Sequence, residues 1–298
     1  MNAPAFALAS SDPLSGILRP QRLTAVIDIG ANPIDGEPPY KGMLGRRLCT
    51  VTGFEPQPEA LATLNARKSD LETYLPYAVG KDGHGILRVT QAPGMTSLFE
   101  PNPAVLSCFN GFPIWGTVLK ELPVATRRLD DLTELAAFDM LKIDVQGSEL
   151  DVFKGGRERL KRVVAVQTEV SLVPLYKSQP VLGEVDLELR GLGLIPHSFA
   201  AINKRMILPA FDTTQPYGGV NQVIEADIVY VRDFTKPETI DDEQYKHLAL
   251  IAHHCYGSYD LAIHCLHRLA ERGAVVADAV RRFIGALKAA SGAKPATL

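Results

Sequence analysis

The sequence predicts an α/β fold in which helices cover both faces of a mostly parallel sheet. Up to about residue 236, short β-branched apolar runs alternate with segments of helical pattern, and this alternation is typical of right-handed βαβ crossovers. The runs are continuous in hydrophobicity, as expected of strands buried on both faces. A chain of 298 residues is long enough to bury such a core and to carry an appendage.

The first expected strand is LTAVIDI, residues 23–29, which ends at Gly30. Further strands are expected at residues 48–54, 73–79, 86–91, 123–129, 139–145, 163–170 and 225–232. Helices are expected at residues 58–68, 130–138, 148–160 and 186–193.

Beyond about residue 236 the pattern becomes purely helical. Residues 243–273 predict two amphipathic helices that break near Gly257, and residues 275–290 predict a third. We therefore expect an N-terminal arm at residues 1–22, a sheet-containing domain at 23–236 and a helical extension at 237–298.

Composition and charge exclude several classes of protein. The net charge of −3 provides no basic surface for a nucleic-acid backbone. The four cysteines are widely spaced and form no CxxC pair, so neither a disulfide framework nor a zinc ribbon is indicated. No Lys or Arg precedes Arg19, and no apolar run approaches the ~18 residues of a membrane span. The sequence predicts a cytoplasmic protein without a membrane span or a nucleic-acid partner.

Acidic residues mark the ends of three expected strands. Asp28 lies just before Gly30, Glu55 follows the second strand, and Asp144 ends the strand at 139–145. In a doubly wound sheet, ligands bind at the carboxyl ends of strands, and an acid after the second strand can accept ribose hydroxyls. Any one of these residues is also an ordinary turn or cap residue. Together they indicate a nucleoside cofactor, either a nicotinamide or S-adenosylmethionine, although no GxGxxG follows the first strand.

Eight sequence blocks in a fixed order narrow this choice. They are VIDIGAN (26–32), GFEPQPEALATLN (53–65), YAVGKDG (77–83), TSL (96–98), RLDDL (128–132), DMLKIDVQGSELDVFKGG (139–156), VQTEVSLVPLYKSQP (166–180) and EADIVYVRD (225–233). With them the chain resembles the FkbM family of S-adenosylmethionine-dependent methyltransferases over roughly residues 23–234. The resemblance implies a class I methyltransferase fold: a Rossmann-like three-layer sandwich with a mostly parallel seven-stranded sheet and an antiparallel last strand.

The resemblance also implies roles for individual residues. Those expected at the cofactor are Asp28, Gly30 and Asn32 along its methionine part, Glu55 at the ribose, Pro56, Ala78, Val79 and more weakly Asp82 around the adenine, and Ser97 and Asp144 facing the methyl group. Two departures stand out. The first block continues as GANPID, with Pro33 and with Ile34 in place of a second glycine, so that Gly36 is the next residue able to supply the turn. Gln146 stands where the family more often has Glu.

The expected reaction is O-methylation of a saccharide, glycan or natural-product hydroxyl, with a non-catalytic cofactor-binding scaffold as the alternative. A hydroxyl acceptor needs a base. Asp144 is the first candidate, Glu169 the second, and His84 and His197 are weaker ones. Asp144, Glu169 and Asp130 could offer oxygen ligands to a divalent metal, but no metal is expected, since Asp130 more simply caps the expected helix at 130–138.

Two segments lie outside this scheme. The irregular tract at 92–121 carries Trp115, Phe109, Phe112 and Pro113, and we expect an acceptor-site loop there rather than a packed structural one. The extension contains a group of histidines and cysteines, His253, His254, Cys255, His264, Cys265 and His267. Their spacing matches no known zinc finger, so core packing in a tetratricopeptide-like hairpin is favoured over metal. The hairpin is expected to pack on the catalytic domain, form a homodimer or dock a protein partner.

Overall fold

The fold is built on one large, mostly parallel sheet. The computed structural model describes residues 12–32 and 36–291. Its seven strands run in the order β3-β2-β1-β7-β8-β10-β9, and β10 is antiparallel to both of its neighbours. The strands are β1 (Thr24–Ile29), β2 (Cys49–Phe54), β3 (Glu72–Leu75), β7 (Met140–Ile143), β8 (Ala165–Ser171), β9 (Leu194–Lys204) and β10 (Val223–Arg232). The predicted fold class is confirmed.

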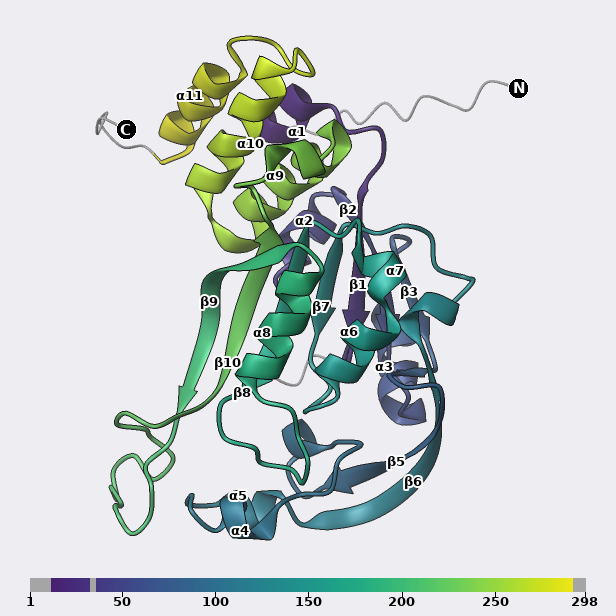
Figure 1. Ribbon diagram of the computed structural model, residues 1–298, viewed down its shortest axis with the longest axis vertical. Coiled ribbons are helices and arrows are strands. Elements are labelled where there is room, and N and C mark those ends of the chain that lie inside the picture. Colours follow the sequence, from purple (N-terminus) through teal and green to yellow (C-terminus); the bar gives the residue numbers. More distant parts are fainter. Residues whose placement is uncertain (1–11, 33–35, 292–298) are drawn as a thin grey trace.

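Helices cover both faces of this sheet because alternate strand residues point to opposite faces. On β1, Ile27 and Ile29 belong to a core shared with α6 (Glu149–Gly155), α7 (Arg157–Leu160) and α8 (Leu182–Gly191). Val26 belongs to a second core, shared with α2 (Lys41–Gly45) and α9 (Asp242–Tyr256). Figure 1 shows α6 and α8 in front of the sheet. Helix α3 (Pro58–Arg67) connects β2 to β3 and buries none of its residues.

The second core joins the two ends of the described chain. Helix α1 (Pro13–Leu18) buries Leu14 and Leu18 in it, together with α10 (Tyr259–Glu271) and α11 (Ala279–Ser291). Figure 1 shows these helices grouped at one end of the sheet. Cys265 is fully buried among the leucines of α10. The segment expected as an N-terminal arm therefore contributes a packed helix.

A small second sheet lies at the opposite end of the molecule (Figure 1). Its order is β4-β6-β5, from β4 (Ala78–Val79), β5 (Gly83–Thr90) and β6 (Val118–Arg127). The single strand expected at residues 73–79 is wrong: it divides at Pro76 into β3 and β4, which belong to different sheets. Proline has no N–H for a ladder and fixes its own φ, so it interrupts the strand.

The tract at 92–121 folds into short helices around its own core. These are η1 (Pro93–Met95), α4 (Pro103–Leu106) and α5 (Phe112–Trp115). Phe109 and Phe112 are buried in a cluster with Tyr176, and the Trp115 ring lies 5.1 Å from the ring of Phe112. The aromatic residues of the tract are therefore packed against one another, and a role of the tract at the acceptor site stays a prediction.

Three further expectations about elements need correction. The helix expected at 130–138 is absent, because only the 3₁₀ turn η2 (Leu129–Asp131) forms there. The helix expected at 148–160 is interrupted at Gly156, between α6 and α7. Strand β9 was not expected at all, and it lies at the edge of the sheet.

After β10, η3 (Pro237–Thr239) leads into α9. Within the described residues, no helix combines the length and apolar character needed to cross a membrane.

Candidate active site

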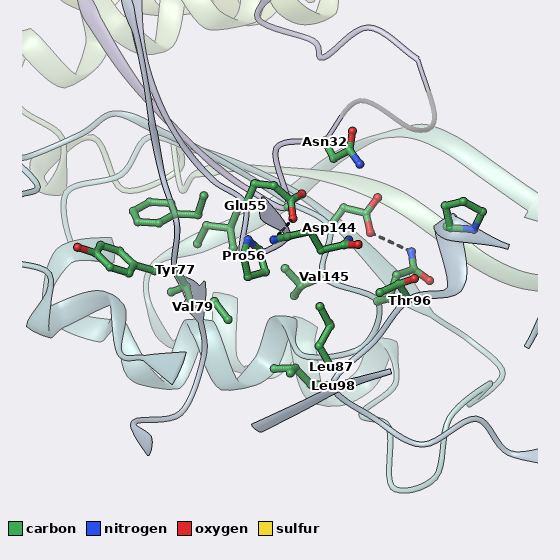
Figure 2. Close-up of a pocket in the computed structure, with 18 residues that line it drawn as sticks. Asn32, Glu55, Pro56, Tyr77, Val79, Leu87, Thr96, Leu98, Asp144 and Val145 are labelled. Carbon is green, nitrogen blue, oxygen red and sulfur yellow. Dashed lines mark hydrogen bonds between the residues drawn. The ribbon is translucent and has the colours of Figure 1, made fainter. Parts of the chain in front are cut away.

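A pocket opens at the carboxyl ends of β1, β2 and β7, facing the small sheet (Figure 2). Parallel strands bring their carboxyl ends to one edge, which is where doubly wound folds bind ligands. The pocket is lined by residues from those strand ends, from the small sheet and from the tract after β5: Ile29, Gly30, Asn32, Phe54, Glu55, Pro56, Gln57, Tyr77, Ala78, Val79, Leu87, Pro93, Gly94, Thr96, Leu98, Asp144, Val145 and Gln146.

Most of the predicted site residues come together in this pocket. The predicted residues that line it are Gly30, Asn32, Glu55, Pro56, Ala78, Val79 and Asp144. Asp28, Ser97 and Glu169 do not line it. In Figure 2, Glu55 and Asp144 lie centrally, with Tyr77 towards one end and Thr96 towards the other.

Gly30 allows two strand ends to approach each other closely. Its φ is +79°, a conformation that side chains other than glycine rarely adopt. A Cβ at this position would lie 2.0 Å from the main-chain oxygen of Asp144. The amides of Gly30 and Ala31 both donate to the carbonyl of Phe54 at 3.1 Å. Gly30 therefore holds the ends of β1, β2 and β7 at the spacing that forms the floor of the pocket.

We expect Gly30→Ala to destabilise the protein by about 3 kcal/mol or more, because it adds a backbone clash to an unfavourable φ. Urea unfolding followed by circular dichroism measures the difference. Gly45→Ala is the matched control, since no atom lies within 4 Å of a Cβ built at Gly45, and its stability should stay within about 1 kcal/mol of the wild type. Equal stabilities for Gly30→Ala and the wild type would contradict this account.

Glu55 is a buried carboxylate with hydrogen-bonding capacity to spare. It is 3% exposed, and its Oε1 accepts the backbone N–H of Gln57 at 2.7 Å. Among the described residues, no hydrogen bond reaches Oε2. Burial raises the pKa of Glu55 above its ordinary value, although the Gln57 N–H opposes the shift. A buried carboxylate of this kind is suited to accept a pair of ligand hydroxyls.

One end of the pocket is apolar. Apart from the predicted Val79, its side chains come from residues that sequence reasoning missed: Phe54, Tyr77, Leu87 and Leu98. Tyr77 is held by Phe54, at a ring-centroid distance of 6.5 Å, and by the Arg127 guanidinium, 4.6 Å from the ring centroid. Leu87, on β5, and Leu98, in the tract after β5, could not be assigned from sequence because only the tertiary fold brings them to the pocket.

Asp28 belongs to a buried polar group and is 1% exposed. Its Oδ2 accepts the Tyr40 hydroxyl at 2.5 Å, and the Lys142 ammonium lies 3.4 Å from Oδ1. Burial raises the pKa of Asp28, while Lys142 and Tyr40 oppose the shift. Lys142 also donates to the carbonyl of Gly30 at 3.3 Å. Asp28 is thus placed to support the turn at Gly30 from outside the pocket.

Two carboxylates converge on the amide group of Gln146. Its Nε2 donates to Oδ1 of Asp144 at 2.9 Å and to Oε2 of Glu169 at 2.7 Å, and its Oε1 accepts the Tyr176 hydroxyl at 3.1 Å. Burial, and then the charge of Asp144, raise the pKa of Glu169 well above its ordinary value. A carboxyl group with a raised pKa close to a pocket is typical of catalytic sites.

The backbone of Gln146 is also constrained. Its φ is +53°, and the following Gly147 has φ +108°. Ser97 donates its hydroxyl hydrogen to the carbonyl oxygen of Gln146 at 2.6 Å and is 1% exposed. Ser97 therefore contacts the loop that carries Asp144, and its neighbours Thr96 and Leu98 line the pocket.

The weaker candidates lie elsewhere. Asp82 and His84 are exposed and do not line the pocket. The Nε2 of His197 lies 2.7 Å from the Ser258 hydroxyl, and burial lowers the pKa of His197.

Two other expectations concern a cap and a loop. Asp130 accepts the backbone N–H groups of Glu158 and Arg159 at 3.2 and 3.0 Å, so it caps α7 rather than the expected helix at 130–138. The departure at Pro33 and Ile34 lies outside the described residues, and Gly36, just beyond them, has φ +116°.

Comparison with known proteins agrees with these features. A family model described as the methyltransferase FkbM domain matches residues 28–195. The chain is 28% identical over 171 residues to the 2-O-methyltransferase NoeI of Sinorhizobium fredii, covering 54% of this chain and 70% of that protein.

Two solved structures are also similar. A methyltransferase FkbM from Methylobacillus flagellatus is 16% identical, with a TM-score of 0.35, over 70% of this chain and 43% of that one, less than half its length. Magnesium protoporphyrin IX methyltransferase from Synechocystis, solved with bound S-adenosylmethionine, is 8% identical, with a TM-score of 0.36, over 70% of each chain. Because the family model covers more than half of the sequence, the chain belongs to the FkbM family of S-adenosylmethionine-dependent methyltransferases.

Proposed function

We propose that this enzyme transfers a methyl group from S-adenosylmethionine to a hydroxyl of a saccharide or another hydroxylated natural product. The observation that carries the proposal is the placement of Glu55 and Asp144 in one pocket, at the ends of β2 and β7 on either side of Gly30. One carboxylate is suited to hold the donor, and the other is suited to act on an acceptor. The related protein NoeI is named as a 2-O-methyltransferase.

The pocket fits the parts of S-adenosylmethionine. The free oxygen of Glu55 would accept the ribose hydroxyls, as an acid after the second strand does in nucleotide-binding folds. Pro56, Ala78 and Val79 would border the adenine, together with the apolar side chains at that end of the pocket. Gly30 and Asn32, on the loop after β1, would contact the methionine part. The donor supplies an electrophilic methyl group on a sulfonium, which is transferred by in-line displacement.

The carboxylate pair supports a hydroxyl acceptor in particular. A hydroxyl is a weak nucleophile until a base takes its proton, and general-base catalysis contributes about 10²–10⁴-fold. Asp144 lines the pocket and is our candidate base, while Glu169, on the same Gln146 amide, is the second candidate. Gln146 fixes the direction of both carboxylates. As the methyl group moves to oxygen, the hydroxyl proton passes to the base.

A transfer assay with isotopically labelled S-adenosylmethionine tests the proposal. The acceptors are a panel of mono- and oligosaccharides, each paired with its 2-deoxy analogue, and mass spectrometry locates the added methyl group. We expect label on a sugar oxygen that is lost when the corresponding hydroxyl is absent. Transfer only to amines or thiols would overturn the hydroxyl assignment, and cofactor binding with no transfer to any panel member would favour the scaffold alternative.

A further inference from the structure

A second polar cluster lies where α1 begins and α9 ends. It consists of Asp12, the N-cap residue of α1, and the adjacent His253 and His254 in the last turn of α9. One ligand-type atom from each residue lies within 4.8 Å of the other two. The two imidazole rings meet edge to face, with centroids 4.3 Å apart. No residue of the cluster lines the pocket described above.

The cluster contains buried nitrogen atoms that lack hydrogen-bond partners. Among the described residues, Nδ1 of His253 and Nε2 of His254 are buried and accept or donate no hydrogen bond. The His254 side chain is 6% exposed, and that of Asp12 is 5% exposed. A buried polar atom without a partner is costly, and each such atom in a native protein calls for an explanation.

The carboxylate of Asp12 is oriented towards these nitrogens. Its Oδ2 accepts the backbone N–H of Ser15 at 2.7 Å, which fixes the carboxylate plane. Its Oδ1 lies 3.2 Å from Nε2 of His254. Although these two atoms are close, the angles at Nε2 of His254 do not allow a hydrogen bond. One carboxylate oxygen and two imidazole nitrogens therefore lie close together.

We propose that Asp12, His253 and His254 bind a zinc ion that joins the start of α1 to the end of α9. Two imidazoles and one carboxylate form a donor set that suits Zn²⁺, with water as the fourth ligand. Residues 1–11 contain no His, Cys, Asp or Glu, so they add no ligand of these types.

The spacing of the cluster agrees with this assignment. Zinc bonds of about 2.0–2.1 Å in a tetrahedral site place neighbouring ligand atoms about 3.3 Å apart. The observed 3.2 Å between Asp12 and His254 matches this value. The remaining separations, of up to 4.8 Å, would have to shorten when the metal binds.

The local electrostatics also favour a cation. The carboxyl end of α9 carries the negative end of a 15-residue helix dipole. The imidazole nitrogens would bind the metal in their neutral form. Asp12 brings a carboxylate oxygen next to these nitrogens.

Zinc binding is measured on the full-length, tag-free protein, since a polyhistidine tag would itself bind the metal. The protein is stripped with a chelator, and its affinity for Zn²⁺ is determined by competition with a zinc indicator. We expect one Zn²⁺ per chain and at least tenfold weaker binding in Asp12→Asn and in His254→Gln. His267→Gln is the matched control, because this histidine lies on α10 with 62% of its side chain exposed and outside the cluster.

A second measurement separates metal binding from folding. We expect Zn²⁺ to raise the midpoint of thermal unfolding of the wild type and of His267→Gln, and to leave that of the Asp12→Asn, His254→Gln double variant unchanged. Circular dichroism of the stripped proteins shows whether each variant is folded, and Asp12→Asn alone is nearly isosteric. The proposal is overturned if the wild type binds zinc no more tightly than the folded double variant does. Asp12 and His254 would then form only an ion pair.

Discussion

Glu55→Gln is expected to weaken the binding of both S-adenosylmethionine and S-adenosylhomocysteine by about 100-fold, or about 3 kcal/mol. The reason is the loss of charged acceptors for the ribose hydroxyls in a site that is 3% exposed. Hydrogen bonds to a charged group contribute about 1.5–3 kcal/mol each. Isothermal titration calorimetry with each ligand measures the change.

Glu59→Gln is the matched control for this experiment. Glu59 lies in the first turn of α3, four residues after Glu55, and is exposed outside the pocket. Its affinity for both ligands should equal that of the wild type. If the folded Glu55→Gln variant kept wild-type affinity, the ribose would have to lie elsewhere, and the placement of the donor in this pocket would be wrong.

Asp144→Asn is expected to reduce kcat by about 10²–10⁴-fold, because it removes the proposed base while keeping the shape of the side chain. The affinity for S-adenosylmethionine should change much less than in Glu55→Gln. Steady-state kinetics with a saccharide acceptor, together with calorimetry, separate the two effects. Asp151→Asn is the control: Asp151 lies on α6 and forms an ion pair with Lys81 at 3.2 Å, away from the pocket lining.

The pH dependence of kcat distinguishes the two carboxylates. Burial and Asp144 raise the pKa of Glu169, so Glu169 keeps its proton to a higher pH than an ordinary carboxyl group. When that proton leaves, the pair carries one more negative charge and takes up the acceptor hydroxyl proton more readily. We therefore expect kcat to rise with pH through the raised pKa of Glu169, and this step to be missing in Glu169→Gln. If Asp144→Asn kept the wild-type kcat and Glu169→Gln lost activity, Glu169 would be the base. Full activity in both variants would exclude both carboxylates as the base.

Strand positions were predictable where hydrophobicity is local and continuous. The runs that become β1, β2, β7 and β10 are rich in apolar and β-branched residues, so their composition alone indicates buried strands. Strand β9 contains Pro196 and His197 and has exposed positions along its length, as an edge strand permits. Only its pairing with β10 makes it a strand, and that pairing is a tertiary contact.

The site was predictable to a similar extent. Gly30, Glu55 and Asp144 could be placed because each directly follows or ends a strand of the central sheet. Gln146 could not be given its role, because its contacts with Asp144 and Glu169 depend on a backbone conformation with φ +53°. The burial of Asp28 could likewise not be predicted from sequence, because its partner Tyr40 reaches it from the loop after β1.

The core shared by the two ends of the chain limits how far the protein can be truncated. Val26 and Met140 of the central sheet are buried against α9, and Leu14 of α1 lies in the same core. A fragment trimmed to residues 28–195, the part that the family model matches, would lose Val26, α1 and α9 and leave Met140 facing water. The apolar core is therefore larger than the segment shared by sequence, and both ends of the described chain contribute to it.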